Sequence, residues 1–312
     1  MMSQGRDVPA IRIAGLDKTF TQGSWRSRRR VSALKSVDLE IGRGEIVALV
    51  GESGSGKSTL ARCIARLETP DAGVLEVLGE DVLRTQPRRA TKAYRRTVQM
   101  VFQDPFGSLN PTQRVEHVLA RPLLLHGGVR GDLRARLEEL VTSVGLPVDV
   151  LGSFPHELSG GQRQRIAIAR VLAVEPDIIV ADEPTSMLDV SVRIGVLNLL
   201  ARLRDERGIA ILYVTHDLAS ARYLADRIVV MHQGVLVEGG DAVALLAEPQ
   251  HPYMRMLVGA VPDPDRRAPY DPAARARQRT EIWEWAESES ARVHVNESAG
   301  HWVWAPKERK TS

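Results

Sequence analysis

The chain has 312 residues, of which 43% are hydrophobic and 26% are charged, a composition typical of a soluble globular protein with a sizeable core. Its net charge of +3 and pI near 9.2 are compatible with an anionic partner and equally with an ordinary solvated surface. The single cysteine, Cys63, excludes a disulfide framework and a cysteine-based metal or iron–sulfur site. The first residues lack the pattern of a secretory signal, and no run of about 18 apolar residues is long enough to span a membrane.

Near the N-terminus, the insertion TQGSWRSRRRV at residues 21–31 predicts a loop. It contains four closely spaced arginines, which are Arg26, Arg28, Arg29 and Arg30. Such a run indicates a solvated stretch of charge, with contact to a membrane surface as the alternative interpretation. The sequence leaves both interpretations open.

Five short apolar runs bounded by Gly, Asp or Pro predict buried strands further along the chain. They cover residues 45–50, 97–102, 177–182, 210–215 and 227–234. Stretches with helical periodicity lie between several of them, at residues 57–67, 162–174, 190–207 and 217–225. Apolar strands that alternate with helices are typical of a mostly parallel sheet covered on both faces. Residues 104–165 show helical patterns only, and we expect an inserted helical subdomain there.

The composition changes after Pro262, where PDPDRRAPYDPAARARQR is rich in proline and arginine and predicts a linker. Beyond it, IWEW, ARVHVNE and HWVWAP alternate apolar and polar residues, which is the period of half-buried strands. Four of the five tryptophans lie in this tail, at Trp283, Trp285, Trp302 and Trp304. We therefore expect a main domain at residues 1–262, followed at 263–312 by the linker and a small β-containing extension.

The stretch GESGSGKST at residues 51–59 follows a predicted strand and opens a predicted helix, which is the setting of a phosphate-binding loop. Glycines let the backbone curl so that N–H groups face phosphate oxygens, aided by the positive end of the helix dipole. Lys57 is expected to reach the β- and γ-phosphates, and the Ser58 hydroxyl to ligate Mg²⁺. The candidate nucleotide-binding residues are Gly51, Glu52, Ser53, Gly54, Ser55, Gly56, Lys57, Ser58 and Thr59.

Polar side chains end three other predicted strands, and the carboxyl ends of parallel strands share one edge of a sheet. Asp182 ends one strand, where it can hold Mg²⁺ through water, and Glu183 projects the next carboxylate toward an attacking water. His216 ends another strand, and the amide of Gln103 ends a third, within reach of both Mg²⁺ and the water. Each residue alone is compatible with a structural role, but together with the phosphate loop they predict a nucleotide-hydrolysing site.

A second candidate anion site lies in SFPHELSGGQRQRIAIAR, where a serine and two glycines precede a helix. The first phosphate loop already holds its own nucleotide. A second set of donors on a separate helical subdomain therefore serves best if it closes on a nucleotide held by a partner subunit. Its candidate residues are Ser159, Gly160, Gly161 and Gln162.

LSGGQ followed by RQRIAIAR resembles the signature of ATP-binding cassette (ABC) transporter ATPases. The phosphate loop, the Gln103 loop, DIIVADEP, SMLD and VTHD stand in that family's order and approximate spacing over residues 10–262. The resemblance implies the α/β fold of a P-loop cassette, with a mostly parallel RecA-like core, N-terminal antiparallel strands and an inserted helical subdomain at about 104–165. It also implies a head-to-tail dimer that sandwiches two ATP molecules, each between one subunit's phosphate loop and the other's signature.

The resemblance further implies roles at individual positions. Glu183 matches the general base, His216 the switch residue at the γ-phosphate, and Gln103 the residue that senses Mg²⁺ and γ-phosphate. Asp182 matches the Mg²⁺-associated acid, and Asp189 the loop that crosses the dimer interface.

Further positions of the family pattern can also be placed. Phe20 in LDKTF matches the aromatic residue that stacks on adenine, with packing in the core as the alternative. Ser159 and Gly161 match the signature donors. Met187 in SMLD departs from the commoner small residue at that position.

Within the family, QDPFGSLNP, HPYMRMLVGAVP and GHWVWAP resemble the importer ATPases for oligopeptides, dipeptides and nickel. The implied function is to power uptake of peptides or similar small solutes, with oligosaccharides and nickel complexes as alternatives. The implied partners are a second cassette, identical or paralogous, two membrane permeases and, indirectly, an extracytoplasmic solute-binding protein, with no nucleic acid. The implied location is peripheral, at the cytoplasmic face of the inner or plasma membrane, and Phe106 and Leu109 are expected to meet a permease helix.

Other ABC classes fit less well. Translation-associated proteins normally carry two cassettes, DNA-repair ATPases carry a long coiled coil or zinc cysteines, and exporters usually carry fused membrane helices. A soluble ABC ATPase without a transport role is the remaining alternative. Many relatives carry a Cys-rich C-terminal segment; this chain has none, which leaves the role of its tail open.

Overall fold

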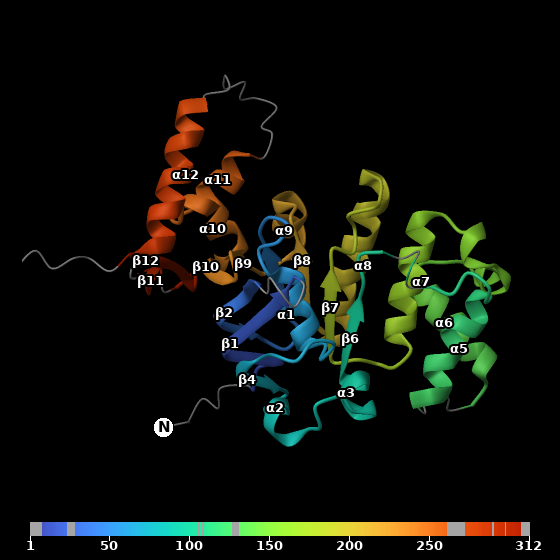
Figure 1. The fold of residues 1–312 in the computed structure, drawn as a ribbon. Coiled ribbons are helices and arrows are strands. Elements are labelled where there is room, and N and C mark those ends of the chain that lie inside the picture. Colours follow the sequence, from blue (N-terminus) through green and yellow to red (C-terminus); the bar gives the residue numbers. More distant parts are fainter. Residues whose placement is uncertain are drawn as a thin grey trace, which may run out of the picture.

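The computed structural model describes residues 8–23, 29–104, 107, 109–126, 131–260, 272–288, 290–296 and 298–306. Its centre is an eight-stranded sheet of order β11-β12-β10-β9-β3-β8-β7-β6 (Figure 1). The five strands from β9 to β6 pair in parallel, and the other three continue the sheet antiparallel. The strands are β3 (Ile46–Val50), β6 (Val98–Val101), β7 (Ile178–Asp182), β8 (Ala210–Thr215), β9 (Arg227–His232), β10 (Val235–Asp241), β11 (Ser290–Asn296) and β12 (His301–Pro306).

The parallel strands are buried on both faces, as their continuous apolar sequences predicted. In β3, Ile46 and Val50 join one hydrophobic cluster, whereas Val47 and Leu49 join the other. This alternation follows from the two-residue period of a strand, which sends successive side chains to opposite faces. The five strands predicted from the sequence are thereby confirmed in position and in kind.

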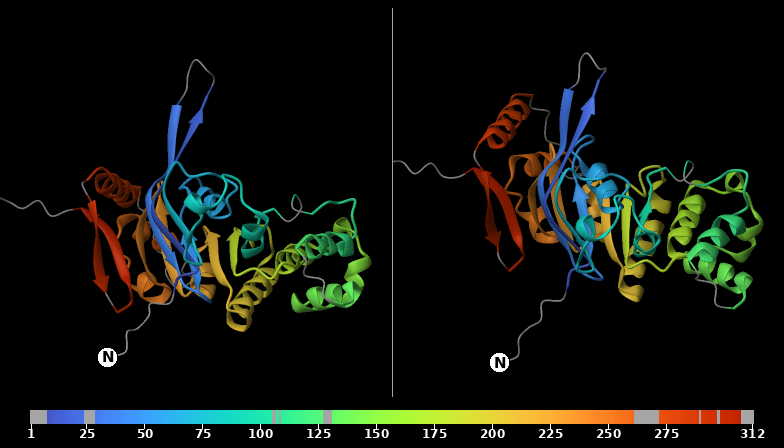
Figure 2. Two further views of the ribbon diagram at one scale, coloured as in Figure 1. Left: turned by 90° about the horizontal axis from the view of Figure 1, so that it is seen from below. Right: turned by 60° about the horizontal axis from the view of Figure 1, so that its bottom comes forward.

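A second, antiparallel sheet of order β2-β1-β4-β5 covers one face of the central sheet (Figure 2). Its strands are β1 (Ile11–Gln22), β2 (Arg29–Ile41), β4 (Ala72–Val77) and β5 (Glu80–Asp81). β1 and β2 stay paired as far as Gln22 and Arg29, so the hairpin projects from the body of the molecule. The predicted loop at residues 21–31 is therefore wrong at its two ends, which are strands, and residues 24–28 lie outside the described residues.

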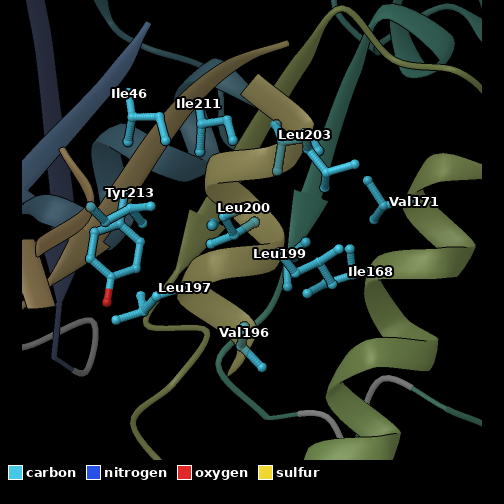
Figure 3. Packing of buried hydrophobic residues seen from close by; sticks show 14 of the residues in the cluster. Ile46, Ile168, Val171, Val196, Leu197, Leu199, Leu200, Leu203, Ile211 and Tyr213 are labelled. Atoms are coloured by element: carbon cyan, nitrogen blue, oxygen red, sulfur yellow. The ribbon is translucent and has the colours of Figure 1, made fainter. Parts of the chain in front are cut away.

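Helices cover the remaining surface of the sheet. They are α1 (Lys57–Ile64), α2 (Val82–Thr85), α3 (Lys92–Thr97), α8 (Val190–Arg207), α9 (Leu218–Leu224), α10 (Ala242–Ala247) and α11 (Pro252–Gly259). α8 presents Leu199 and Leu203 toward Ile168 and Val171, in a core that also includes Ile211 of β8 (Figure 3). Cys63 of α1 is buried, which raises the pKa of its thiol to about 12.

Helical elements separate β6 from β7 and lie at one end of the molecule (Figure 1). They are α5 (Val115–His126), α6 (Leu133–Ser143), η1 (Val148–Gly152), η2 (Pro155–Glu157) and α7 (Gly160–Leu172). No strand occurs between Phe102 and Leu172 in the part that is described, as the sequence predicted, although 104–165 as a domain boundary stays a prediction.

The C-terminal extension contains α12 (Pro272–Glu287) and the hairpin of β11 and β12. The segment from Ile282 to Trp285 belongs to α12, so the prediction of a strand there is wrong. The predicted linker is also helical from Pro272 onward. The predictions for ARVHVNE and HWVWAP as strands are confirmed, and β12 pairs with β10, so the extension continues the central sheet.

Within the described residues, no helix is both long enough and apolar enough to cross a membrane.

Candidate active site

A cleft of about 1140 Å³ opens at the carboxyl edge of the parallel strands. It contains the phosphate loop, the residues that follow β6, β7 and β8, and the first half of β2. The sequence-predicted residues that line it are Gly51, Glu52, Ser53, Gly54, Gly56, Lys57, Ser58, Thr59, Gln103, Glu183 and His216. Segments up to 165 residues apart in the chain therefore meet at one edge of the sheet, because parallel strands end there together.

The phosphate loop curls between β3 and α1 under tight steric limits. Gly56 has a φ of +112°, and a Cβ atom there would lie 2.4 Å from the Ala33 carbonyl oxygen. Only glycine fits such a position without displacing backbone. The next residue, Lys57, donates from Nζ to the carbonyl oxygens of Gly51 and Glu52, both at 2.7 Å.

Lys57 and Asp182 are charged groups in largely buried positions. Burial lowers the pKa of the Lys57 ammonium, while the carboxylates of Glu183, Asp182 and Glu52 oppose that shift. Burial raises the pKa of the Asp182 carboxyl, and the hydrogen bond from Ser58 Oγ, at 3.1 Å, counteracts it. Burial disfavours the ionised form of each group, so anionic phosphates beside Lys57 and a cation beside Asp182 would stabilise both ionised forms.

The oxygen atoms of Ser58, Asp182 and Gln103 suit Mg²⁺. Ser58 contributes a hydroxyl oxygen, Asp182 a carboxylate and Gln103 an amide oxygen, and hard divalent cations prefer such oxygen ligands. Asp182 itself does not line the cleft but reaches it through Ser58. The residues present are therefore compatible with a nucleotide-bound Mg²⁺.

Glu183 is the centre of a hydrogen-bonded group at the rim of the cleft. Its Oε2 accepts a hydrogen bond from Gln103 Nε2 at 2.9 Å, and its Oε1 lies 3.1 Å from His216 Nδ1. Glu183 adopts a φ of +46°, unusual for a residue with a side chain, and its N–H donates to the Val214 carbonyl of the neighbouring strand at 2.9 Å. The backbone is thus held in a strained conformation that directs this carboxylate toward Gln103 and His216.

The second candidate anion site lies away from the cleft. Ser159 caps α7: its Oγ accepts a hydrogen bond from the Gln162 N–H at 3.3 Å, and Gln162 Oε1 accepts one from the Ser159 N–H at 2.9 Å. A Cβ atom on Gly161 would lie 2.2 Å from Val192 Cγ1 of α8. Ser159 is exposed, and none of the predicted residues from 159 to 162 lines the cleft.

Residues 34–186 match the family model described as ABC transporter. A putative peptide import ATP-binding protein of Brucella ovis is 43% identical over 260 residues, which cover 83% of this chain and 80% of that protein. The dipeptide transport ATP-binding protein DppF of Escherichia coli is 41% identical over 264 residues, covering 83% of this chain and 79% of that one. The chain belongs to the ABC transporter family.

The fold agrees with this family. A solved dimeric ATP-binding cassette in a post-hydrolysis state, bound to ADP and Pi, superposes with a TM-score of 0.66 at 32% identity. The match covers 74% of this chain and 98% of that one. This ABC ATPase therefore has the P-loop cassette fold with its parallel and antiparallel sheets.

Besides Asp182 and residues 159–162, three further predicted site residues of the ABC ATPase do not line the cleft. Phe20 is half-buried in β1, with Lys18 Nζ 5.2 Å from its ring centroid, and it does not line the cleft. Ser55 is buried, and its carbonyl accepts a hydrogen bond from Gly234 N–H in the turn after β9. Asp189 is exposed at the N-terminus of α8. The roles of Phe20 and Asp189 stay predictions.

The cleft also contains residues that the sequence did not suggest. Arg29, Arg30 and Lys35 line it from β2, and Gln233 and Leu257 line it as well. The run of arginines was visible in the sequence, but only the long pairing of β1 with β2 places two of them beside the phosphate loop.

Proposed function

We propose that this ABC ATPase is the ATP-hydrolysing subunit of an importer that powers the uptake of peptides or similar small solutes. One observation carries the catalytic part of the proposal. The Glu183 carboxylate contacts Gln103 and His216 at the rim of the cleft that also contains Lys57. The transport part rests on relatives named as peptide import and dipeptide transport ATP-binding proteins.

The mechanism follows from the residues of the cleft. ATP phosphates take the place of the Gly51 and Glu52 carbonyls as partners of Lys57 Nζ. Ser58, Asp182 and Gln103 would hold Mg²⁺, and the bound ion would neutralise charge on the phosphate oxygens.

Glu183 accepts a proton from the attacking water, since its carboxylate is already directed into the cleft. His216 and Gln103 hold that carboxylate and orient the water toward the γ-phosphate. Positioning and charge neutralisation carry most of this catalysis.

A second cassette completes the site in this proposal. Asp189 is flanked by three exposed apolar side chains, Met187, Val190 and Ile194. Exposed apolar side chains beside a predicted interface residue favour burial against another protein surface. Ser159 lies exposed at the start of α7, where it can reach the γ-phosphate of an ATP in the partner's cleft.

The surface that we assign to the permeases is a groove of about 450 Å³ between β6 and α5. Phe102 and Leu125 line it and are 40% and 52% exposed. Leu109, expected from the sequence to meet a permease helix, is 3% exposed and packed in the core, and Phe106 lies outside the described residues. Phe102 therefore replaces Leu109 in the proposal, beside Gln103, so that docking at the groove reaches the catalytic amide directly.

The remaining details are proposed from the same resemblance. They are a peripheral position at the cytoplasmic face of a membrane and an external solute-binding protein that delivers the cargo. The cleft binds nucleotide and selects no cargo, so peptides, oligosaccharides and nickel complexes are distinguished only by uptake assays with the permeases.

Glu183→Gln tests the catalytic proposal. We expect ATP hydrolysis to fall about 10²-fold to 10⁴-fold, the usual contribution of a general base, while ATP binding is retained. Phosphate release and binding of a fluorescent ATP analogue measure the two effects. Glu206→Gln, on the exposed face of α8, is the matched control and should leave both unchanged. Sustained hydrolysis in Glu183→Gln would rule out the assigned base.

A further inference from the structure

The phosphate loop is held from outside by a residue of the C-terminal region. The Glu52 N–H donates to the Tyr253 hydroxyl at 2.8 Å. In the same peptide unit, the Gly51 carbonyl accepts the hydrogen bond from Lys57 Nζ at 2.7 Å. One peptide plane thus connects the Tyr253 hydroxyl to the lysine of the phosphate loop, so the orientation of that plane affects both.

Tyr253 is buried in α11 and is fixed by two histidines. Its ring packs against the His232 imidazole, with centroids 4.2 Å apart, and its backbone N–H donates to His251 Nδ1 at 3.1 Å. Burial lowers the pKa of His251 to about 3, with His232 and Arg255 adding to the shift, so the imidazole is neutral and Nδ1 accepts. The edge of His251 meets Trp285 of α12, with centroids 4.9 Å apart.

Glu238 of β10 joins this region to the C-terminal hairpin. It is 0% exposed, and its carboxylate accepts hydrogen bonds from the backbone N–H groups of Gln250, at 2.8 Å, and His251, at 3.0 Å. Its Oε1 also lies 2.8 Å from His301 Nε2 at the start of β12. A buried carboxylate with these partners fixes the segment before Tyr253 relative to the hairpin.

The hairpin approaches β10 too closely for a side chain at Gly239 or Gly240. A Cβ atom on Gly239 would lie 2.8 Å from the Trp302 ring, and one on Gly240 would lie 2.9 Å from His301 Cα. β12 is therefore built into the sheet beside Glu238, and the position of His301 is set by main-chain packing.

We propose that Tyr253 is a positioning residue for the phosphate loop and that the C-terminal extension sets its position through His301, Glu238 and His251. The inference rests on the proposed function, in which residues 51–59 bind the phosphates of a nucleoside triphosphate. The Tyr253 hydroxyl keeps the peptide between Gly51 and Glu52 in the orientation that receives phosphate. Removing the hydroxyl leaves that N–H without its acceptor, and the loop must reorder when ATP binds.

Tyr253→Phe tests the first step. We expect KM for ATP to rise about 3-fold to 10-fold while kcat changes less than about 2-fold, because the loss falls on ground-state and transition-state binding alike. Binding of a fluorescent ATP analogue to the full chain should weaken by the same factor. Tyr223→Phe is the matched control, since its hydroxyl bonds to Asn198 on the exposed side of α9. An unchanged KM, or a loss of kcat with a lower unfolding midpoint at constant KM, would overturn the proposal.

His301 variants test the second step. His301→Ala should raise KM for ATP in the same direction by about 2-fold to 5-fold, and His301→Gln, which keeps a donor toward Glu238, should restore it. Combining His301→Ala with Tyr253→Phe should add little beyond Tyr253→Phe alone, because both act on one peptide. His294→Ala, exposed on β11 of the same hairpin, is the control. Additive effects of the two changes, or no recovery with glutamine, would contradict the coupling.

Lys57→Ala separates failure of this inference from failure of the proposed function. If Lys57→Ala abolishes hydrolysis while Tyr253→Phe behaves as wild type, only the positioning role of Tyr253 is wrong. If Lys57→Ala hydrolyses ATP normally, the assignment of the phosphate loop is wrong and the inference is lost with it.

Discussion

Two helix N-termini in this protein carry glycines and a serine, yet they differ in what surrounds them. At α1, the loop before Lys57 lies in a cleft with Gln103, Glu183 and His216. At α7, Ser159 is exposed, and the described residues that line the cleft do not include it. The site at α1 is assembled within a single chain, whereas the site at α7 exposes its donors on the surface.

The glycines at the two sites also serve different needs. Gly56 has a positive φ that curls the loop around its ligand position. Gly161 has no such φ, but a Cβ there would collide with Val192 of the next helix. A glycine in a signature is therefore not by itself a sign of contact with phosphate, because close packing of two helices requires it equally.

The largest expected effect tests whether Ser159 acts at a site other than the cleft of its own chain. Ser159→Arg should lower hydrolysis about 10²-fold, the usual loss when one transition-state donor is removed, but leave ATP affinity of the chain within about 2-fold. The reason is that Ser159 lies outside the chain's own cleft. Phosphate release and fluorescent nucleotide binding measure the two quantities.

Mixing variants sharpens the same prediction. When chains with Ser159→Arg are mixed with chains that carry Lys57→Ala, a dimer with one chain of each kind keeps one intact composite site. Hydrolysis by the mixture should therefore recover in part. A fall in ATP affinity of the isolated Ser159→Arg chain would contradict the separation of the two sites.

A smaller effect tests the packing role of Gly161. Gly161→Ala should destabilise the protein by about 1–3 kcal/mol through overpacking against Val192. Adding Val192→Ala should recover both stability and hydrolysis, because alanine keeps the backbone N–H. Urea unfolding and phosphate release are the measurements. Gly160→Ala is the control, since its Cβ would meet Leu188 at an ordinary 3.6 Å; a loss of hydrolysis that persists in the double variant would favour a direct role of Gly161.

The smallest effect concerns the arginines at the mouth of the cleft. Arg30→Ala should raise KM for ATP about 2-fold to 4-fold, because an exposed charge contributes less than about 1 kcal/mol. The effect should fade as salt is raised, since screening shortens the reach of an exposed charge. Arg84→Ala, exposed on α2, is the control and should leave KM unchanged. Equal KM values for Arg30→Ala and wild type at low salt would show that Arg30 does not contact the nucleotide.

Much of the active site was predictable because its signals are local. Asp182, Gln103 and His216 each follow a continuous apolar run, and such runs are the most reliable sign of a buried parallel strand. Once three strands are parallel neighbours, their ends must meet. The contact of Glu183 with both Gln103 and His216 was not predictable, since it depends on a positive φ that no sequence pattern specifies.

The errors arose where a pattern was too short or its context was missing. Four residues of alternation at 282–285 suggested a strand. The segment is part of α12, in which Ile282 is buried and Trp283 is exposed, so a helix produces the same short alternation. The polar stretch at 21–31 suggested a loop, but strand pairing overrides polarity when a hairpin is long.

The sequence by itself predicted a phosphate-binding loop and determined which strands lie in the core and which family the chain resembles, because glycine spacing and apolar periodicity act over a few residues. Only the tertiary structure decided that Tyr253 meets Glu52, 201 positions away, and that His301 meets Glu238, 63 positions away. Such contacts depend on how finished strands and helices pack, and no local periodicity records that packing. The same holds for Arg29 and Arg30, whose charges are plain in the sequence and whose place at the cleft is set by the pairing of β2 with β1.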